Sequence, residues 1–584
     1  MTRATIALVS IAAFLGLCTP AWALNFTVNS QADAVDAVPG NHVCETAPGN
    51  GVCTLRAAVQ EANASSGADV ITLPAGFYGF TIAGDDNTAA AGDLDVTQDL
   101  TLTGAGARST TVDPEGIDRA FDVIGPTVHF SIGGVAITGG FSDNGGAIDN
   151  GGTLTVTDSW LHDNSVGSAD GGAIESGGPL TITRSALTGN SGYNGGALDL
   201  GSSTTTISDT TISGNHAGNL ASNGDGGGMD VGTGPLTITD STIVDNQSFN
   251  GSSSGGGIDG TATLRGTIVA HNFAFQAGTS NPGVLDNCEN TAVDLGNNLE
   301  DADTCGLHGA SDVHGNPLLG PLEDNGGPTD TRALLAGSPA INHGPGGGNC
   351  PATDQRGVAR PQGAACDIGA YEFAPPGTST TPASGVGSAT AVLNASVNPN
   401  ALPTSVHFEY GTTAAYGSST PPVAGGNGVS AGTVSAAVAG LKPNTTYHYR
   451  VVAASADGSV AGADSTFTTT AGRTPPRVTV TRMPKKLKLK ALLRGLKVKA
   501  RSNEPAAFVF ELKGFARKVT LAKRFNLTLA SKSLKLGTGS RSVKLKPSRK
   551  LLSHSRRFTV QVVVTATDAA GNHKTVTRTI KVAR

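Results

Sequence analysis

The chain has 584 residues, with 80 glycines but only 18 Phe, 7 Tyr and 2 Trp. So few aromatic side chains exclude one large aromatic core, although 38% hydrophobic residues suffice to fold several domains. The net charge of -6 hides an asymmetry, because residues 473–584 carry 29 basic and 3 acidic side chains and residues 1–472 carry 11 basic and 43 acidic ones. Net charges of +26 and -32 exclude one uniform body and indicate parts with different electrostatic roles.

The first 23 residues have the pattern of a secretory signal peptide. Arg3 precedes an apolar run over residues 4–17, and residues 21–23 (Ala-Trp-Ala) form a small-x-small cleavage site. A lipid-modified Cys18 is disfavoured because Leu17 stands where a small residue is expected. No later stretch reaches the roughly 20 apolar residues of a membrane span. We therefore expect a secreted protein that is either free in the extracellular medium or held at a cell surface by something other than a transmembrane helix.

Six cysteines remain after that segment, and they form three couples that are local in sequence. An exported chain resides where disulfides persist, whereas a zinc site is disfavoured because no CxxC spacing or paired histidines accompany the cysteines. We predict the disulfides Cys44–Cys53, Cys288–Cys305 and Cys350–Cys366.

Internal repeats dominate residues 140–275. Five gap-free blocks with alternating Leu/Ile/Val and Thr/Ser end in an asparagine, and Gly-Gly-x-apolar-acid segments recur between them. Such short runs of β-formers predict strands separated by Gly and Asn turns. One unit cannot bury its apolar face alone, so we predict that the units stack as coils of a right-handed parallel β-helix. The block-ending residues are Asn164, Asn190, Asn215, Asn246 and Asn272.

Equivalent residues of stacked coils form ladders along the axis. A stacked Asn amide can donate to one neighbour and accept from the other, which predicts a structural asparagine ladder. The acid of each Gly-Gly segment would stack into a column about 5 Å apart, which calcium could bridge; the simpler interpretation is a solvated turn position. Apart from calcium here, the sequence predicts no cofactor. The column consists of Asp149, Glu175, Asp199, Asp230 and Asp259.

Three motifs carry a family resemblance. Residues 53–63 (CTLRAAVQEAN) resemble the "CSLREA" motif of secreted bacterial β-helix proteins, with Thr for Ser and Ala57 for Glu. The Gly-Gly-Ala-Ile blocks resemble repeats of polymorphic outer-membrane adhesins, and segments within 324–372 resemble the end module named choice-of-anchor Q. The resemblance covers residues 24–373. It implies an extracellular β-helix of a type without agreed catalytic residues.

Both ends of this β-helix are predicted to be capped. Residues 52–63 form an amphipathic pattern that predicts a helix over the first coil's open edge. At the other end, a cluster of Asp354, Arg356 and Asp367 beside a disulfide is expected to hold the cap.

Two further domains follow. Residues 374–384 have the composition of a Pro/Ser/Thr linker, and residues 441–451 resemble a late strand of fibronectin type III domains, which predicts a sandwich over 385–471. Residues 473–584 alternate apolar and basic side chains, and 566–572 resemble the closing hairpin of bacterial immunoglobulin-like modules. The predicted class is all-β, a parallel β-helix followed by two β-sandwiches.

The sequence favours binding or adhesion over catalysis. A catalytic groove should interrupt the repeats with grouped acid and base residues, as polysaccharide lyases and glycoside hydrolases require. Arg184 and Arg265 are the candidates for a lyase base, but a lone arginine on a repetitive coil is more often a surface ion-pair partner. An extracellular polysaccharide lyase or glycoside hydrolase is the alternative function.

The charge of residues 473–584 predicts a partner of opposite sign. An anionic envelope polymer or membrane surface is favoured over nucleic acid, since the chain is exported and lacks interleaved aromatics there; a basic domain without a partner is the simpler alternative. The β-helix is expected to bind carbohydrate or a host or neighbouring surface. We expect a monomer.

Overall fold

The computed structural model describes residues 23–219, 222–251, 254–276, 283–472, 474–515, 526–537, 539–549 and 557–583. The predicted signal peptide, apart from its last residue, lies outside these ranges. Strands make up nearly all the regular structure, with two short α-helices and one 3-10 turn, so the predicted all-β class is confirmed.

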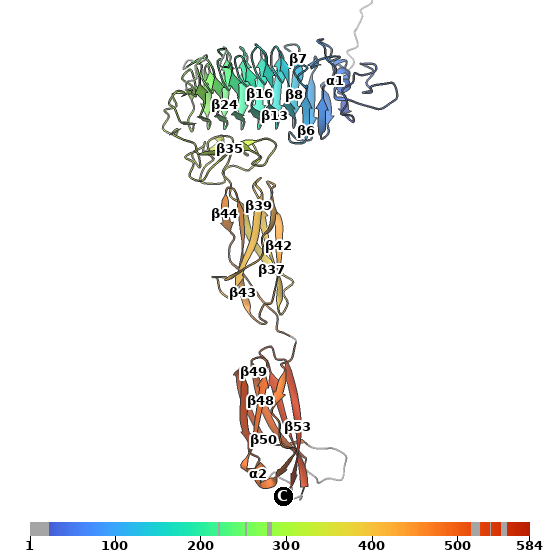
Figure 1. Cartoon of the computed structure of the whole chain (residues 1–584), viewed down its shortest axis with the longest axis vertical. Helices are drawn as coiled ribbons and strands as arrows, with labels where there is room; N and C mark the ends of the chain where they lie inside the picture. The colour runs from blue at the N-terminus through green and yellow to red at the C-terminus, as the bar shows by residue number, and fades with distance from the viewer. Residues whose placement is uncertain are drawn as a thin grey trace, which may run out of the picture.

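Residues 25–314 form a parallel β-helix. Each full coil passes through four sheets, named A, B, D and C in the order in which the chain visits them, and strands of successive coils pair in parallel, apart from the antiparallel pair β30–β31 at the end of sheet D. Sheets A and B have ten strands each, and sheets C and D have seven. Because the coil order is A, B, D, C, sheet C lies across the coil from sheet B (Figure 1).

The strands of the four sheets have the following bounds. Sheet A contains β1 (Asn25–Thr27), β2 (Asp69–Leu73), β5 (Leu100–Gly104), β8 (His129–Gly133), β12 (Thr153–Thr157), β16 (Leu180–Thr183), β20 (Thr205–Ser208), β24 (Leu236–Thr239), β28 (Ala262–Arg265) and β32 (Val293–Asp294). Sheet B contains β3 (Gly76–Gly79), β6 (Thr110–Asp113), β9 (Ala136–Thr138), β13 (Trp160–His162), β17 (Ala186–Thr188), β21 (Thr211–Ser213), β25 (Thr242–Val244), β29 (Ile268–Ala270), β33 (Leu299–Glu300) and β34 (Val313–His314). Sheet C contains β4 (Leu94–Val96), β7 (Phe121–Val123), β11 (Ile148–Asn150), β15 (Ile174–Ser176), β19 (Leu198–Leu200), β23 (Met229–Val231) and β27 (Ile258–Asp259). Sheet D contains β10 (Phe141–Ser142), β14 (Ser165–Val166), β18 (Ser191–Gly192), β22 (His216–Ala217), β26 (Gln247–Ser248), β30 (Phe273–Ala274) and β31 (Val284–Leu285).

The alternating pattern of each block sets the register of the coils. In β12, Leu154 and Val156 are fully buried, while the threonines that alternate with them are less buried. Leu154 pairs with Leu180, and Val156 pairs with Ile182, so the apolar residues stack into columns inside the coil. A slip of one residue would turn these columns outward, which is why the register is strongly determined.

The glycine pairs are needed where the backbones of successive coils come close. A Cβ on Gly172 would lie 2.1 Å from the carbonyl oxygen of Gly196, and one on Gly196 would lie 2.1 Å from that of Gly227. No side chain fits there, so the repeat keeps glycine.

The block-ending asparagines form a continuous buried ladder. From Asn190 on, each side-chain oxygen accepts from the backbone N–H and the amide of the asparagine in the preceding coil, as in the 2.9 Å and 3.0 Å bonds from Asn190 to Asn215. The same amide also donates to a carbonyl in the coil before it, here from Asn190 to Leu161 at 3.0 Å. The ladder continues one step further than the repeat predicts, to Asn287. The predicted members Asn164, Asn190, Asn215, Asn246 and Asn272 all take part.

Helix α1 (Leu55–Asn63) lies over the first coils, in contact with β2 and β4. Thr54 caps it by accepting from the Ala57 N–H at 3.1 Å, and the apolar face predicted from the sequence is buried. Disulfide Cys44–Cys53 precedes the helix, and Cys288–Cys305 lies in the last coils.

The segment after the β-helix, residues 319–373, is called here the flanking module. It contains β35 (Leu319–Glu323), β36 (Thr331–Leu334), a 3-10 turn (Gly347–Asn349) and disulfide Cys350–Cys366. The prediction that it caps the end of the β-helix is wrong, because it packs along the outer face of sheet B (Figure 1). Thr211 of β21 donates to Gln355 at 2.7 Å, and the Ala370 N–H donates to Thr242 of β25 at 3.0 Å.

The middle sandwich has two antiparallel sheets. Sheet E contains β37 (Gly377–Ser384), β38 (Thr390–Asn398) and β42 (Gly432–Ala439). Sheet F contains β39 (Thr404–Gly411), β40 (Ser418–Ser419), β41 (Val423–Gly426), β43 (Thr446–Ser455), β44 (Gly458–Ala461) and β45 (Ser465–Thr468). The predicted linker 374–384 is therefore mostly a strand, because β37 pairs with β38 along its length. Tyr449 is fully buried in the core, and Tyr447 nearly so.

The basic sandwich is also antiparallel, apart from the parallel pair β47–β53. Sheet G contains β46 (Val478–Val480), β48 (Leu496–Ser502) and β51 (Ser540–Leu545). Sheet H contains β47 (Lys486–Lys488), β49 (Ala506–Phe515), β50 (Asn526–Gly537), β52 (Arg557–Thr567) and β53 (His573–Ala583), and α2 (Leu489–Arg494) follows β47. The β-helix lies crosswise above the two sandwiches, which follow one another below it (Figure 1). Neither α-helix in the described ranges is long and apolar enough to span a membrane.

Candidate functional site

A column of carboxylates runs along the outer face of sheet C. The predicted acids Asp149, Glu175, Asp199, Asp230 and Asp259 are in register on successive strands. The column also includes Asp122 of β7 and Asp95 of β4, which the sequence analysis did not assign to it. These seven residues are called the carboxylate ladder. All are partly exposed except Asp95, which is buried.

One guanidinium serves this ladder within the described ranges. Arg119 Nη1 lies 3.0 Å from Asp149 Oδ2, and its Nε lies 3.4 Å from Asp93 Oδ2 and 3.7 Å from Asp118 Oδ1. Further along the rod, Glu175, Asp199, Asp230 and Asp259 have no such partner in that part of the chain. Arg119 follows Asp118 and precedes β7, outside the aligned repeat blocks, so the repeat pattern did not identify it as a partner of the ladder.

Burial raises the pKa values of the ladder, and nearby carboxylates raise most of them further. The pKa of Asp122 rises to about 6, that of Glu175 to about 7, and that of Asp199 to about 7. The pKa of Asp230 rises to about 6, and that of Asp259 also rises, by burial and by Glu289. Glu175 and Asp199 are therefore partly protonated near neutral pH, so they can both donate and accept hydrogen bonds.

No three His, Cys, Asp or Glu side chains in the described ranges are grouped so that they could hold a metal ion. The ladder carboxylates stand on separate strands, one per coil, so a bridging cation would have to draw neighbours together. Calcium binding by the ladder stays a prediction.

Arg184 and Arg265, the candidates for a lyase base under the alternative function, lie at the turn between sheets A and B, across the fold from the ladder. Arg184 makes a bidentate ion pair with Asp158, in which Nε and Nη2 each lie 2.8 Å from a carboxylate oxygen. This hydrogen bonding raises the pKa of Arg184. Arg265 ends β28 in register with Thr239, and its Nε has no hydrogen-bond partner. A catalytic role for either arginine stays the less favoured alternative.

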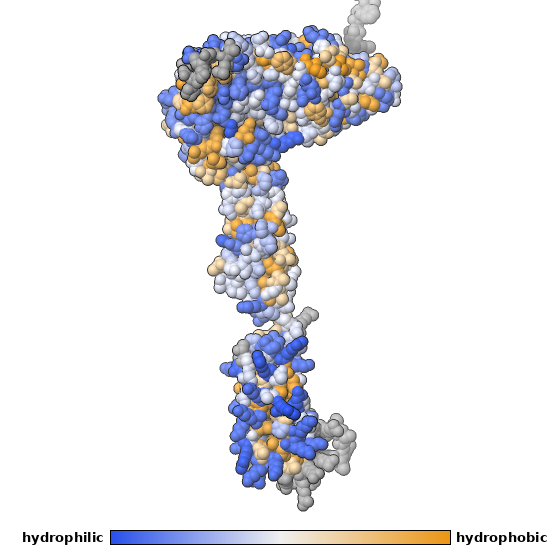
Figure 2. All heavy atoms as spheres, in the orientation of Figure 1, coloured by the Kyte–Doolittle hydropathy of each residue, from blue (hydrophilic) through white to orange (hydrophobic). Residues whose placement is uncertain are grey.

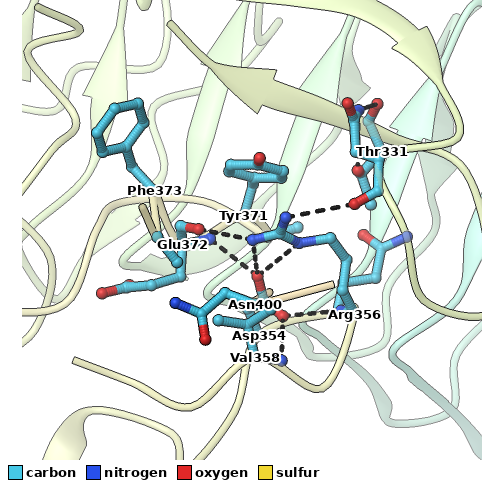
Figure 3. Close-up of polar contacts among 12 residues, drawn as sticks. Thr331, Asp354, Arg356, Val358, Tyr371, Glu372, Phe373 and Asn400 are labelled. Atoms are coloured by element: carbon cyan, nitrogen blue, oxygen red, sulfur yellow. Dashed lines mark hydrogen bonds and ion pairs between the residues drawn. The ribbon is translucent and has the colours of Figure 1, made fainter. Parts of the chain in front are cut away.

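A buried arginine of the flanking module lies beside the contact with the middle sandwich (Figure 3). Arg356 Nε and Nη2 lie 2.9 Å and 2.7 Å from Asp354 Oδ2, and Nη2 donates to the Glu372 carbonyl at 2.6 Å. Its guanidinium stands 3.5 Å from the centre of the Tyr371 ring. The predicted Asp367 does not bond to Arg356; it accepts from the Asn342 N–H instead.

The same tyrosine reaches into the next domain. Its hydroxyl donates to both oxygens of Asp457 on the β43–β44 turn, at 2.9 Å and 3.0 Å, and the Ala374 N–H donates to Asp457 at 2.9 Å. Asn400 adds a bond to the Pro375 carbonyl at 2.8 Å. Asp457 had no distinguishing sequence context, because its role depends on a contact 86 residues away.

We expect Asp457→Ala to loosen the β-helix from the middle sandwich. The variant removes the acceptor of Tyr371 and of the Ala374 N–H, which orient the two bodies. Small-angle X-ray scattering should then give a broader distance distribution, with the circular dichroism spectrum unchanged. Asp464→Ala, on an exposed edge of the same sandwich, serves as the control, and identical scattering from both variants would contradict this role.

The basic sandwich is rich in unpaired cations. In its described ranges, the carboxylate–cation pair is Lys513 Nζ to Glu511 Oε2 at 3.1 Å, and the other lysines and arginines have no acidic partner there. Hydrophilic side chains accordingly cover much of its visible surface (Figure 2).

No family description and no curated protein matches the chain. Among solved structures, it is similar to the sensor domain of the anti-sigma factor RsgI4 of Pseudobacteroides cellulosolvens, with 19% identity over 17% of this chain and 97% of that one and a TM-score of 0.14. A two-domain fibronectin type III segment of chicken tenascin shares 12% identity over 35% of this chain and 99% of that one, with a TM-score of 0.18. The FN1–FN3 domains of chicken CNTN1 share 14% identity over 36% of this chain and 67% of that one, with a TM-score of 0.13. Scores this low carry no argument about function.

Proposed function

We propose that this is a secreted binding protein, held at an anionic cell surface by its basic sandwich, that presents the carboxylate ladder of its β-helix outward. The observation that carries the proposal is the placement of the ladder. Sheet B is covered by the flanking module, from which the two sandwiches extend, and sheet C lies across the coil on the far side (Figure 1). The acidic face and the basic sandwich are thereby kept apart.

Three disulfides support a location outside the cytoplasm, where such bonds persist. The resemblance of residues 53–63 and 324–372 to secreted β-helix proteins supports the same location. The junction at Asp457 supports a display role, because it fixes the direction in which the β-helix faces.

The partner proposed for the β-helix is a carbohydrate or the surface of a neighbouring cell. Tyr193 is 41% exposed at the end of β18, and the Phe249 and Phe275 rings stack with their centres 5.2 Å apart in later coils. Aromatic faces pack against the C–H faces of sugars, and partly protonated carboxyl groups hydrogen-bond to sugar hydroxyls. Both kinds of group lie along the D-to-C side of the β-helix.

Salt should release the protein from cells. Raising ionic strength to 1 M shortens the Debye length to about 3 Å, which removes attraction between exposed charges and a surface. We expect the full chain to wash off at 1 M salt, and a chain ending at residue 472 to appear in the medium. The basic sandwich has its own hydrophobic core, so its removal leaves the other cores intact. If the full chain at 1 M salt and the chain ending at residue 472 both remained on the cells, the proposed surface docking would be contradicted.

A further inference from the structure

One sheet of the basic sandwich presents a straight row of exposed cations on its central strand. In sheet G, the outward residues of the central strand β48 are Lys497, Lys499 and Arg501, all exposed, and the alternate residues are buried. Lys544 of β51 is directly opposite Lys497 and is also exposed. These four residues are called the cationic face.

Sheet H is different. Along its two long strands β52 and β53, less buried positions pair Thr565 with Thr575, whose hydroxyls lie 2.9 Å apart, and Val563 with Thr577. On β49 the outward Lys513 is neutralised by Glu511. Sheet H has other exposed cations, among them Lys532 and Lys535 of β50 and Lys574 and Arg578 of β53, but none of its described strands carries three cations at alternate positions as β48 does.

The cationic face has no internal compensation. Lys497 and Lys544 are like charges directly across a strand pair, an arrangement that destabilises a sheet unless another charge offsets it. No carboxylate of the described ranges pairs with any of the four cations. Hydroxyl donors stand beside them, since Ser542 is opposite Lys499 and Ser540 is opposite Arg501.

We propose that the cationic face is the docking site for a linear phosphate-bearing polymer of the cell envelope. Alternate residues on one strand lie about 7 Å apart, so β48 offers a straight row of three cations suited to a chain of regularly spaced charges. Lysine binds phosphate as a point charge, and neighbouring hydroxyls donate to the remaining oxygens. This inference rests on the proposed surface docking and names its ligand and its residues.

A bilayer is the less suitable partner. Docking on lipid by exposed charge is strengthened by apolar side chains that insert between headgroups. Among the described residues of this sandwich, the exposed large hydrophobics are Val509 and Leu527, which belong to β49 and β50 of sheet H. The outward positions beside the cations of sheet G hold serine and threonine instead, including Thr479 opposite Arg501.

The test compares two full-length variants that each lose four exposed positive charges. The face variant is K497Q/K499Q/R501Q/K544Q, and the control variant is K532Q/K535Q/K574Q/R578Q on β50 and β53. The probe is immobilised long-chain inorganic polyphosphate at 150 mM salt. The face variant should bind roughly 100-fold more weakly than the unaltered chain, and its salt dependence should be shallower by about 3 in log–log slope, whereas the control should change by less than about 5-fold. Equal melting temperatures establish that both variants are folded.

Other results would overturn the inference. Equal weakening of both variants would assign binding to net charge, and no weakening of the face variant would exclude the face. Binding of the unaltered chain to phosphatidylglycerol-containing vesicles but not to polyphosphate would assign the face to lipid. Retention of the face variant on cells with release by 1 M salt would reject the cationic face while leaving the proposed surface docking intact.

Discussion

Replacing Asn215 by alanine is expected to destabilise the β-helix by about 3–5 kcal/mol, since it leaves several buried groups without partners. The side-chain oxygen of Asn215 accepts from the Asn190 backbone and amide at 2.9 Å and 3.0 Å. Its amide donates to Asn246 at 2.9 Å and to the Leu187 carbonyl at 3.0 Å. All these atoms are shielded from water, because Asn190, Asn215 and Asn246 are fully buried. Alanine satisfies none of them.

Denaturant unfolding with amide hydrogen exchange measures this effect. The β-helix and the two sandwiches have separate cores, so they can unfold in separate transitions. Hydrogen exchange of individual amides then shows which transition belongs to the β-helix. Asn250→Ala is the matched control, since this asparagine is exposed and its side chain donates to Asp225 at 2.8 Å. It should cost less than about 1 kcal/mol. Similar costs for the two variants would contradict a structural role for the ladder.

The repeated part of the fold was predictable because each repeat contains the sequence features that its coil requires. Alternating apolar residues, a turn asparagine and a glycine pair recur in every coil, and stacking is the arrangement that satisfies all three. Asp95 and Asp122 escaped detection because their coils lack the glycine pair before the strand. The remaining signal was an apolar–Asp–apolar triplet, Leu94-Asp95-Val96 and Phe121-Asp122-Val123, which is common outside β-helices.

The flanking module could not be placed from sequence. Its contact with sheet B uses the hydroxyls of residues such as Thr211 and Thr242, each the first residue of its strand. Local periodicity marks these residues as outward-facing but does not say what covers them. The same holds for Tyr371 and Asp457, whose pairing joins two domains. The crosswise attachment of the β-helix, and hence the outward direction of the carboxylate ladder, could therefore not be predicted from the sequence.

Lowering the pH from 8 to 5 should stabilise the β-helix, with a rise in melting temperature of roughly 5 °C or more. In unfolded chains, Asp and Glu titrate near 4, whereas burial raises the folded-state pKa of Glu175 and Asp199 to about 7 and that of Asp122 to about 6. Between about pH 4 and 8 the folded form binds more protons, so stability falls as pH rises through this window. Burial also lowers the pKa of His216, which acts in the opposite direction but is one group against several. Differential scanning calorimetry across this range measures the slope.

Neutralising part of the ladder should flatten this pH dependence. The triple variant E175Q/D199N/D230N removes three groups whose pKa values burial raises, to about 7, 7 and 6, so its melting temperature at pH 8 should approach that at pH 5. The control E115Q/D85N/D143N changes three exposed acids outside the ladder and should keep the slope of the unaltered chain. A melting temperature that rises with pH between 5 and 8 would show that the ladder is solvated and charged throughout. A slope that persists in the triple variant would place its origin elsewhere, for example at Asp209, whose pKa burial raises to about 7.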